Sequence, residues 1–168
     1  MNLHSEILEQ PERLAALLNN QKQTVLDIAR AIQKQNVQYV FLAARGTSDN
    51  AGRYANYLWG AHNGLPLALA TPSLFTYYQT PPRLQNALVV GISQSGQSPD
   101  IVSVIDEGRK QNCLTLAITN NVDSPLAKAA DLVLDIQAGA EKAVAATKTY
   151  TTELMAIAML SAALDNSS

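Results

Sequence analysis

Five short apolar runs recur along the 168-residue chain, and stretches with helical spacing of apolar residues separate them. The runs cover residues 37–43, 65–70, 87–92, 114–119 and 131–136. Their length and their β-branched residues predict strands. Strands that alternate with helices pair in parallel, because each crossover helix must return over the sheet. The sequence therefore predicts an α/β fold: a three-layer α/β/α sandwich around a five-stranded parallel sheet.

The helical segments predict how the chain is divided. We expect two helices between Ile7 and Gln35, a sheet core over residues 36–146 and a C-terminal helix over residues 147–165, all within one domain spanning residues 1–168. Further helices are predicted over residues 53–62 and 101–111, and shorter ones begin at Pro72 and Pro125. The expected strand order is 2-1-3-4-5, as in flavodoxin-like folds, with a Rossmann-type order as the alternative.

Serines gather in the loop that follows the third predicted strand. Ser93, Gln94, Ser95 and Ser98 lie between this strand and a helix that Pro99 opens, with Ser98 as the N-cap. Hydroxyl, amide and backbone N–H donors at a helix N-terminus favour an anion. The loop contains neither lysine nor arginine, so neutral donors would hold that anion.

A second hydroxyl-bearing turn follows the first predicted strand. It contains Gly46, Thr47 and Ser48, preceded by Arg45, which could neutralise an anion or pair with Asp49. In a sheet of order 2-1-3-4-5, the first and third strands are neighbours, and ligands bind at their carboxyl ends. The two loops are therefore predicted to form the walls of one anion-binding crevice.

Several nucleotide and catalytic motifs are missing from these loops. The first turn lacks the Gly-x-Gly-x-x-Gly pattern of dinucleotide folds, and no Gly-Lys-Ser/Thr phosphate loop occurs. Ser95 is not in a Gly-x-Ser-x-Gly elbow, and the two histidines, His4 and His62, lie outside both loops. These patterns argue against a dinucleotide enzyme, a P-loop protein and a serine hydrolase.

Composition limits the partners that we expect. The net charge is −2 and no basic cluster contains aromatic residues, which argues against nucleic-acid binding. The single cysteine, Cys113, allows no internal disulfide, and no Cys/His set predicts a metal site. No cofactor is expected. Residues 1–12 do not resemble a signal peptide, and the apolar stretch 154–164 is too short to cross a membrane, so a cytoplasmic location is the default.

In combination, four segments resemble the SIS (sugar isomerase) domain family. They are Glu6-Ile7-Leu8-Glu9-Gln10-Pro11, Arg45-Gly46-Thr47-Ser48, Ser93-Gln94-Ser95-Gly96-Gln97-Ser98, and Ala138-Gly139-Ala140-Glu141 with Val144-Ala145-Ala146-Thr147-Lys148. The chain is most similar to the first SIS domain of the isomerase half of glucosamine-6-phosphate synthase and to stand-alone deaminase-like relatives. The resemblance covers nearly the whole chain.

The resemblance implies a set of ligand contacts. It places Ser93, Gln94, Ser95 and Ser98 on a sugar phosphate. The same pocket would be lined by Gly46, Thr47 and Ser48, and Val144 and Ala146 would lie against the sugar. The family has a serine at the position of Ala146, so a hydroxyl contact is missing there. The implied ligand is of the fructose 6-phosphate or glucosamine 6-phosphate type.

Proton transfer in such a reaction needs a base close to the sugar carbons. Glu141 is the best-placed carboxylate and Lys148 the nearest cation, so we take both as candidate catalytic residues, with structural roles as the alternative. Glu153, within the predicted C-terminal helix, is interpreted as a surface or interface group. His62, at a predicted helix terminus, is expected to be structural.

Two departures from the family pattern shape the expected function. The resemblance begins at the isomerase half, so we expect no glutaminase activity, and the sequence contains one SIS copy where these relatives normally carry two. It is therefore expected to be incomplete as an enzyme alone, and to pair with a second SIS domain or form a homodimer through the apolar stretch 154–164. The predicted function is sugar-phosphate binding in an amino-sugar phosphate isomerase or deaminase. The alternative is a non-catalytic phosphosugar-binding or regulatory module.

Overall fold

A computed structural model describes residues 3–165, so the predicted domain ends, residues 1–2 and 166–168, lie outside the described part. The helices are α1 (Leu3–Leu8), α2 (Gln10–Asn20), α3 (Lys22–Lys34), α4 (Thr47–Asn63), α5 (Ser73–Thr76), α6 (Pro99–Lys110), α7 (Pro125–Ala129) and α8 (Lys148–Asp165). The strands are β1 (Tyr39–Ala44), β2 (Leu67–Leu69), β3 (Ala87–Ile92), β4 (Leu114–Thr119) and β5 (Leu132–Asp135).

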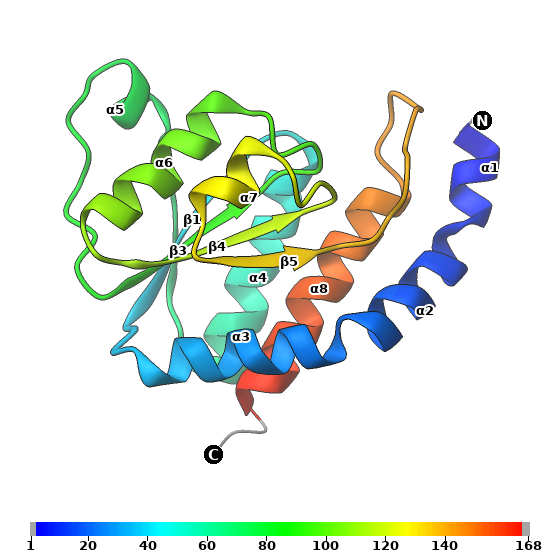
Figure 1. Ribbon diagram of the computed structural model, residues 1–168, viewed down its shortest axis with the longest axis horizontal. Coiled ribbons are helices and arrows are strands. Elements are labelled where there is room, and N and C mark those ends of the chain that lie inside the picture. The colour runs from blue at the N-terminus through cyan, green and yellow to red at the C-terminus, as the bar shows by residue number, and fades with distance from the viewer. Residues whose placement is uncertain (1–2, 166–168) are drawn as a thin grey trace.

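The five strands form one all-parallel sheet of order β2-β1-β3-β4-β5 (Figure 1). This confirms the predicted 2-1-3-4-5 order and excludes the Rossmann-type alternative. Strands β1 and β3 lie side by side along their full lengths, with Tyr39 opposite Ala87 and Ala44 opposite Ile92. The loops that follow these strands therefore leave the sheet at the same edge.

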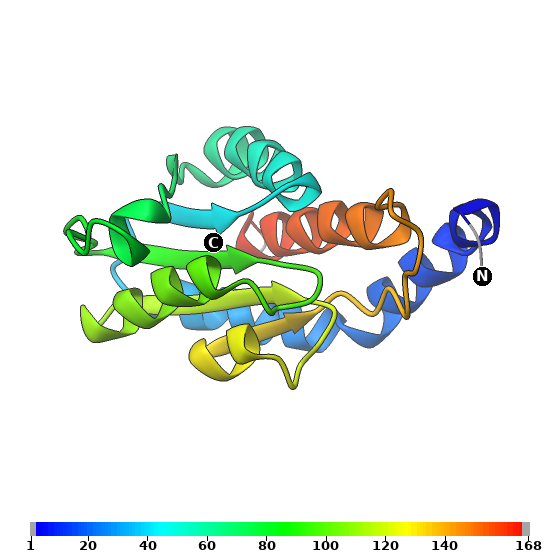
Figure 2. The same cartoon turned by 90° about the horizontal axis from the view of Figure 1, so that it is seen from above.

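Helices cover both faces of the sheet, which gives the three predicted layers (Figure 2). One core joins α2, α3, α4 and α8 to the sheet and includes Leu17, Ile28 and Trp59. A second core joins α6 and α7 to the other face through Ile101, Ile105 and Leu126. Since side chains alternate between the two faces of a strand, the continuous apolar runs supply both cores.

The N-terminal helices match the expected ones, whereas one later helix starts earlier than expected. Helices α2 and α3 are the two predicted between Ile7 and Gln35, and α1 precedes them; Pro11, which lacks a backbone N–H, lies in the first turn of α2. Helix α4 begins at Thr47, six residues before the expected start. Its first turns lack apolar spacing, yet Gly52 brings the helix against β1: a Cβ there would lie 2.7 Å from a methyl carbon of Leu42.

Helix α8, the expected interface helix, lies largely inside its own domain. It packs against α4, α2 and α3. Its residues Ala156, Ile157 and Leu160 are fully buried in the core that these helices share with the sheet. No exposed large apolar side chain within residues 3–165 lies on α8, whereas α1 carries several. Burial within this domain therefore explains why α8 has almost no polar face.

Candidate functional site

The turn after β1 carries the first group of predicted site residues. Gly46 adopts φ +56°, a backbone conformation that favours glycine, and this bend ends β1 and starts α4 at Thr47. Thr47 is exposed and Ser48 is buried. Arg45 forms an ion pair with Asp100 of α6, a partner that the sequence did not suggest. The two hydroxyls thus lie at the carboxyl edge of the sheet, beside the start of a helix.

The serine loop after β3 is folded around its own hydroxyls. The Ser93 hydroxyl accepts a hydrogen bond from the Gly96 N–H (3.2 Å), and the Ser95 hydroxyl accepts one from the Gln97 N–H (3.3 Å). Ser98 is the N-cap of α6, as predicted, but its side chain makes no capping bond. Gly96 has φ +63°, and a Cβ there would lie 2.1 Å from the Ser124 hydroxyl oxygen. Only glycine fits this bend.

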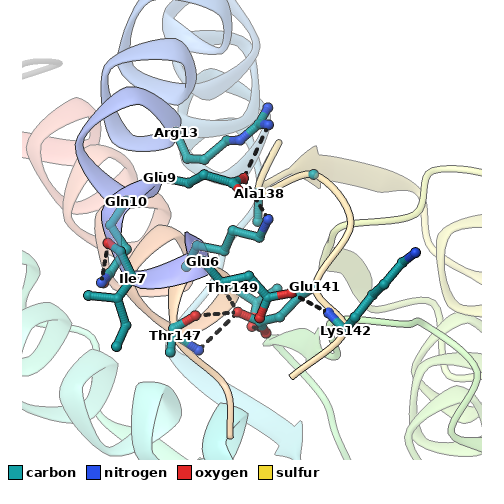
Figure 3. Close-up of polar contacts among 12 residues, drawn as sticks. Glu6, Ile7, Glu9, Gln10, Arg13, Ala138, Glu141, Lys142, Thr147 and Thr149 are labelled. Carbon is teal, nitrogen blue, oxygen red and sulfur yellow. Dashed lines mark hydrogen bonds and ion pairs between the residues drawn. The ribbon is translucent and has the colours of Figure 1, made fainter. Parts of the chain in front are cut away.

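A third segment, residues 137–147, joins β5 to α8 and is held by acidic side chains (Figure 3). The carboxylate of Glu141 accepts hydrogen bonds from the backbone N–H and hydroxyl groups of both Thr147 and Thr149. It thereby satisfies N–H groups at the start of α8 that have no partner within the helix. Although burial raises the pKa of Glu141, the hydrogen bonds from Thr149 and Thr147 outweigh burial and lower it.

The N-terminal helices hold the same segment from outside. Glu6 of α1 is fully buried, and its carboxylate accepts hydrogen bonds from the backbone N–H groups of Lys142 (2.6 Å) and Ala143 (3.1 Å), as Figure 3 shows for Lys142. Beside it, Glu9 accepts a 2.7 Å hydrogen bond from the Lys148 ammonium, which is also fully buried. Charge-assisted hydrogen bonds therefore fix the middle of the segment and the start of α8, which follows it.

The three segments enclose a cavity of about 190 Å³ at the carboxyl edge of the sheet. Its lining combines hydroxyl, amide, carboxyl and small apolar groups: Thr47, Ser48, Gln94, Glu141, Ala143, Val144, Ala146, Thr149, Tyr150 and Glu153. Of the predicted site residues, Thr47, Ser48, Gln94, Glu141, Val144 and Ala146 come together here. Gly46, Ser93, Ser95, Ser98 and Lys148 are not among the lining residues.

Glu153 is the site residue that the sequence analysis placed wrongly. It is not a surface group: its side chain is only 1% exposed, and it borders the cavity. The Ser48 hydroxyl donates a 2.8 Å hydrogen bond to its carboxyl. A sequence signal existed, because Glu153 is the only charged residue between Thr149 and Ala163, on a helix that has to be buried.

The surroundings of Glu153 make its carboxyl easy to protonate. Burial raises the pKa of Glu153 to about 7; the Ser48 hydroxyl opposes this shift and the neighbouring Glu141 carboxylate adds to it. A carboxyl that titrates near neutral pH can give and take protons there. The cavity thus contains one ionised carboxylate, Glu141, and one carboxyl poised between its two states.

The described residues form neither a metal-binding cluster nor a membrane-spanning helix. Within residues 3–165, no group of three or more His, Cys, Asp or Glu side chains could hold a metal ion. No helix in this part of the chain has the length and apolar character needed to cross a membrane. Cys113 is buried, and its thiol donates to the Leu84 carbonyl oxygen.

The strand order defines a doubly wound α/β domain of the flavodoxin-like class, with a polar cavity beside β1 and β3. The model of the SIS domain family matches residues 32–163. The chain therefore belongs to the SIS domain family.

Known proteins of related sequence and structure agree with this assignment. The chain is 34% identical over 161 residues to the isomerising glutamine–fructose-6-phosphate aminotransferase of Caldanaerobacter subterraneus, covering 92% of this chain and 26% of that protein. A protein of Silicibacter pomeroyi, provisionally named a phosphosugar isomerase, superposes with a TM-score of 0.93 at 38% identity, over 97% of this chain and 50% of the other.

The C-terminal domain of the glucosamine-fructose-6-phosphate aminotransferase of Francisella tularensis also superposes, with a TM-score of 0.80 at 29% identity, over 96% of this chain and 46% of the other. The chain thus spans about a quarter of the curated relatives that it matches and about half of these solved chains. It is similar to part of the isomerase half of the aminotransferases, and the match does not extend over their whole length.

Proposed function

We propose that this chain binds a hexose 6-phosphate of the fructose 6-phosphate or glucosamine 6-phosphate type, as one domain of an amino-sugar phosphate isomerase or deaminase. The observation that carries the proposal is the cavity in which Thr47 and Ser48 meet Gln94 and Glu141. Its polar lining suits sugar hydroxyls, which both donate and accept hydrogen bonds. The names of the relatives, which act on fructose 6-phosphate, support the same ligand class.

The phosphate is assigned to the serine loop. Ser93, Gln94, Ser95 and Ser98 would supply neutral donors beside the N-terminus of α6, whose dipole favours an anion. Although Ser93 and Ser95 accept bonds within the loop, a hydroxyl that accepts one bond can still donate its proton to a phosphate oxygen. Gly46, whose φ of +56° sets the bend after β1, would place Thr47 and Ser48 on the facing wall. The sugar would then extend toward the cavity, where Val144 and Ala146 lie.

The two predicted catalytic residues receive different proposed roles. Glu141 borders the cavity and stays a candidate for proton transfer, although its carboxylate already accepts bonds from Thr147 and Thr149. Lys148 forms its ion pair with Glu9 outside the cavity lining, so we assign it a positioning role, in holding residues 137–147 in place.

Other parts of the site are proposed to come from a second domain. The cavity, about 190 Å³, is smaller than typical small-molecule sites of about 300–1,000 Å³. A second SIS domain, or a second copy of this chain in a homodimer, would enlarge and close it. In this proposal, residues 1–35, 36–146 and 147–165 form one SIS domain that works in the cytoplasm with such a partner.

Calorimetric titration of the 168-residue chain tests the binding proposal. Fructose 6-phosphate and glucosamine 6-phosphate are expected to bind, and unphosphorylated fructose is not. Ser95→Ala should weaken phosphate binding about tenfold, because it removes one hydrogen bond to a charged group. Ser103→Ala, which changes a serine within α6, serves as the control and should leave affinity unchanged.

Two results would contradict the proposal: no measurable binding of either 6-phosphate by the chain alone or together with its partner domain, or equal affinities for the wild type and Ser95→Ala. Assays of isomerisation and ammonia release, run in the presence of the partner domain, separate the two forms of the function. Binding without turnover would favour the non-catalytic phosphosugar-binding module.

A further inference from the structure

Both charged side chains that line the cavity are acidic. Glu141 and Glu153 border it, and no lysine or arginine does so among the described residues. The remaining lining groups are neutral. The cavity therefore carries negative charge that the lining itself does not neutralise, which disfavours an anion there and favours a cation.

The two carboxyl groups differ in how many hydrogen-bond donors surround them. Four hydrogen-bond donors from Thr147 and Thr149 satisfy Glu141. Glu153 receives one hydrogen bond, from Ser48, and it forms no ion pair with any lysine or arginine within residues 3–165. A buried carboxylate without a counter-ion is unfavourable. Glu153 is thus the group in the cavity whose charge a ligand could balance.

Two cations of the chain, Lys148 and Arg13, pair with Glu9 and not with Glu153. The Lys148 ammonium lies 2.7 Å from a Glu9 carboxylate oxygen, and Arg13 lies 3.4 Å from the same oxygen. Hard metal ions take six or more oxygen ligands, and residues 3–165 contain no group of three or more ligating side chains. An organic cation fits this site better than a metal ion.

We propose that Glu153 is a specificity-determining residue that selects ligands with an ammonium group, so that the site prefers a 2-amino-2-deoxy-hexose phosphate to the same sugar with a hydroxyl group at C2. This inference rests on the proposed function, because it needs the phosphate to be held by the serine loop. An ammonium has three N–H donors, and the Glu153 carboxylate and the hydroxyls of Thr47 and Ser48 are acceptors around one cavity. The carboxylates repel the phosphate from this end, which fixes the orientation of the ligand.

Glucosamine 6-phosphate and glucose 6-phosphate provide a matched pair of probes, since they differ only in the amine. Calorimetry at pH 7.5 should show that the wild-type chain binds the amine at least about tenfold more tightly, the effect of one charge-assisted hydrogen bond. Glu153→Gln keeps the shape of the side chain without its charge. It should reduce the ratio of the affinities for glucosamine 6-phosphate and glucose 6-phosphate to within about twofold. The exposed-carboxyl control, Glu12→Gln, should retain the wild-type ratio.

The pH dependence of the wild-type ratio supplies a second measurement that does not depend on the folding of a variant. Lowering the pH from 7.5 to 6.0 protonates Glu153, so the preference for the amine should fall several-fold. The ligand amine gains charge over the same range, which alone would raise the preference. Glu141 and Tyr150 are the other titratable side chains that line the cavity.

The outcomes separate this inference from the proposed function. If neither 6-phosphate binds, the proposed function fails. If both bind with equal affinity, or if Glu153→Gln or the lower pH leaves the preference unchanged, hexose 6-phosphate binding stands and the role of Glu153 is overturned.

Discussion

Replacing Glu153 by glutamine is expected to stabilise the fold by about 3 kcal/mol at pH 8. The buried carboxyl of Glu153 has a pKa of about 7, against an ordinary value of 4.5. Each pKa unit corresponds to about 1.4 kcal/mol, so keeping this group ionised in the folded state costs about 3 kcal/mol. Glutamine resembles the neutral acid and avoids that cost. Urea denaturation at several pH values measures the difference.

The sign of the pH dependence follows from proton binding. Between pH 4.5 and pH 7 the unfolded chain has lost the Glu153 proton while the folded chain retains it, so the free energy of unfolding falls as the pH rises. The free energies of unfolding of the wild type and Glu153→Gln should therefore differ little at pH 4 and diverge up to about pH 7.5. Glu12→Gln, at an exposed carboxyl, should follow the wild type. A constant difference between wild type and Glu153→Gln over this range would contradict the account.

Replacing Glu6 by alanine should destabilise the chain by about 3 kcal/mol. The substitution leaves the backbone N–H groups of Lys142 and Ala143 without their acceptor. Each hydrogen bond to a charged group contributes about 1.5 to 3 kcal/mol, and both bonds are partly buried. Chemical denaturation measures the global loss. Faster amide hydrogen exchange at Lys142 and Ala143 would show that the segment over the cavity has loosened.

Two comparisons make the Glu6 prediction specific. Glu6→Gln retains a carbonyl oxygen that can accept both bonds, so its free energy of unfolding should fall by only about 1 kcal/mol. Glu12→Ala removes an exposed carboxyl of α2 and should change stability by no more than about 0.5 kcal/mol. If Glu6→Ala were no more destabilised than Glu12→Ala, the segment 137–147 would not depend on α1.

The layout of the sheet could be predicted because its strands are continuous apolar runs. Strands β3 and β4 begin and end where the sequence predicts. Strand β2 is shorter than its run, since it lies at the sheet edge and pairs with one neighbour only. The early start of α4 could not be found from spacing, because Thr47, Ser48 and Asp49 are residues typical of turns and the contact of Gly52 with β1 is tertiary.

Part of the site could be predicted from topology. Parallel strands place their following loops at one edge of the sheet, and Thr47 and Ser48 therefore line the same cavity as Gln94. Ser93 and Ser95 are not among the lining residues, and their hydroxyls accept hydrogen bonds from their own loop. The phosphate contacts of these serines stay a prediction.

The roles of Glu6 and Glu153 could not be read from local pattern. Glu6 contacts backbone 136 residues away, and Glu153 accepts a bond from a serine 105 residues away. Residues that contact each other at such separations in the sequence form no recognisable local pattern. Burial of a lone carboxyl on an apolar helix was the available clue for Glu153, and its interpretation as a surface group ignored that α8 is enclosed on most sides.

A crystal structure of the chain soaked with glucosamine 6-phosphate tests the central claim most directly. The account predicts the phosphate at the loop of residues 93–98, beside the start of α6, and the sugar in the cavity between Ser48 and Glu153. Density for the phosphate away from this loop, or for the sugar outside the cavity, would contradict it.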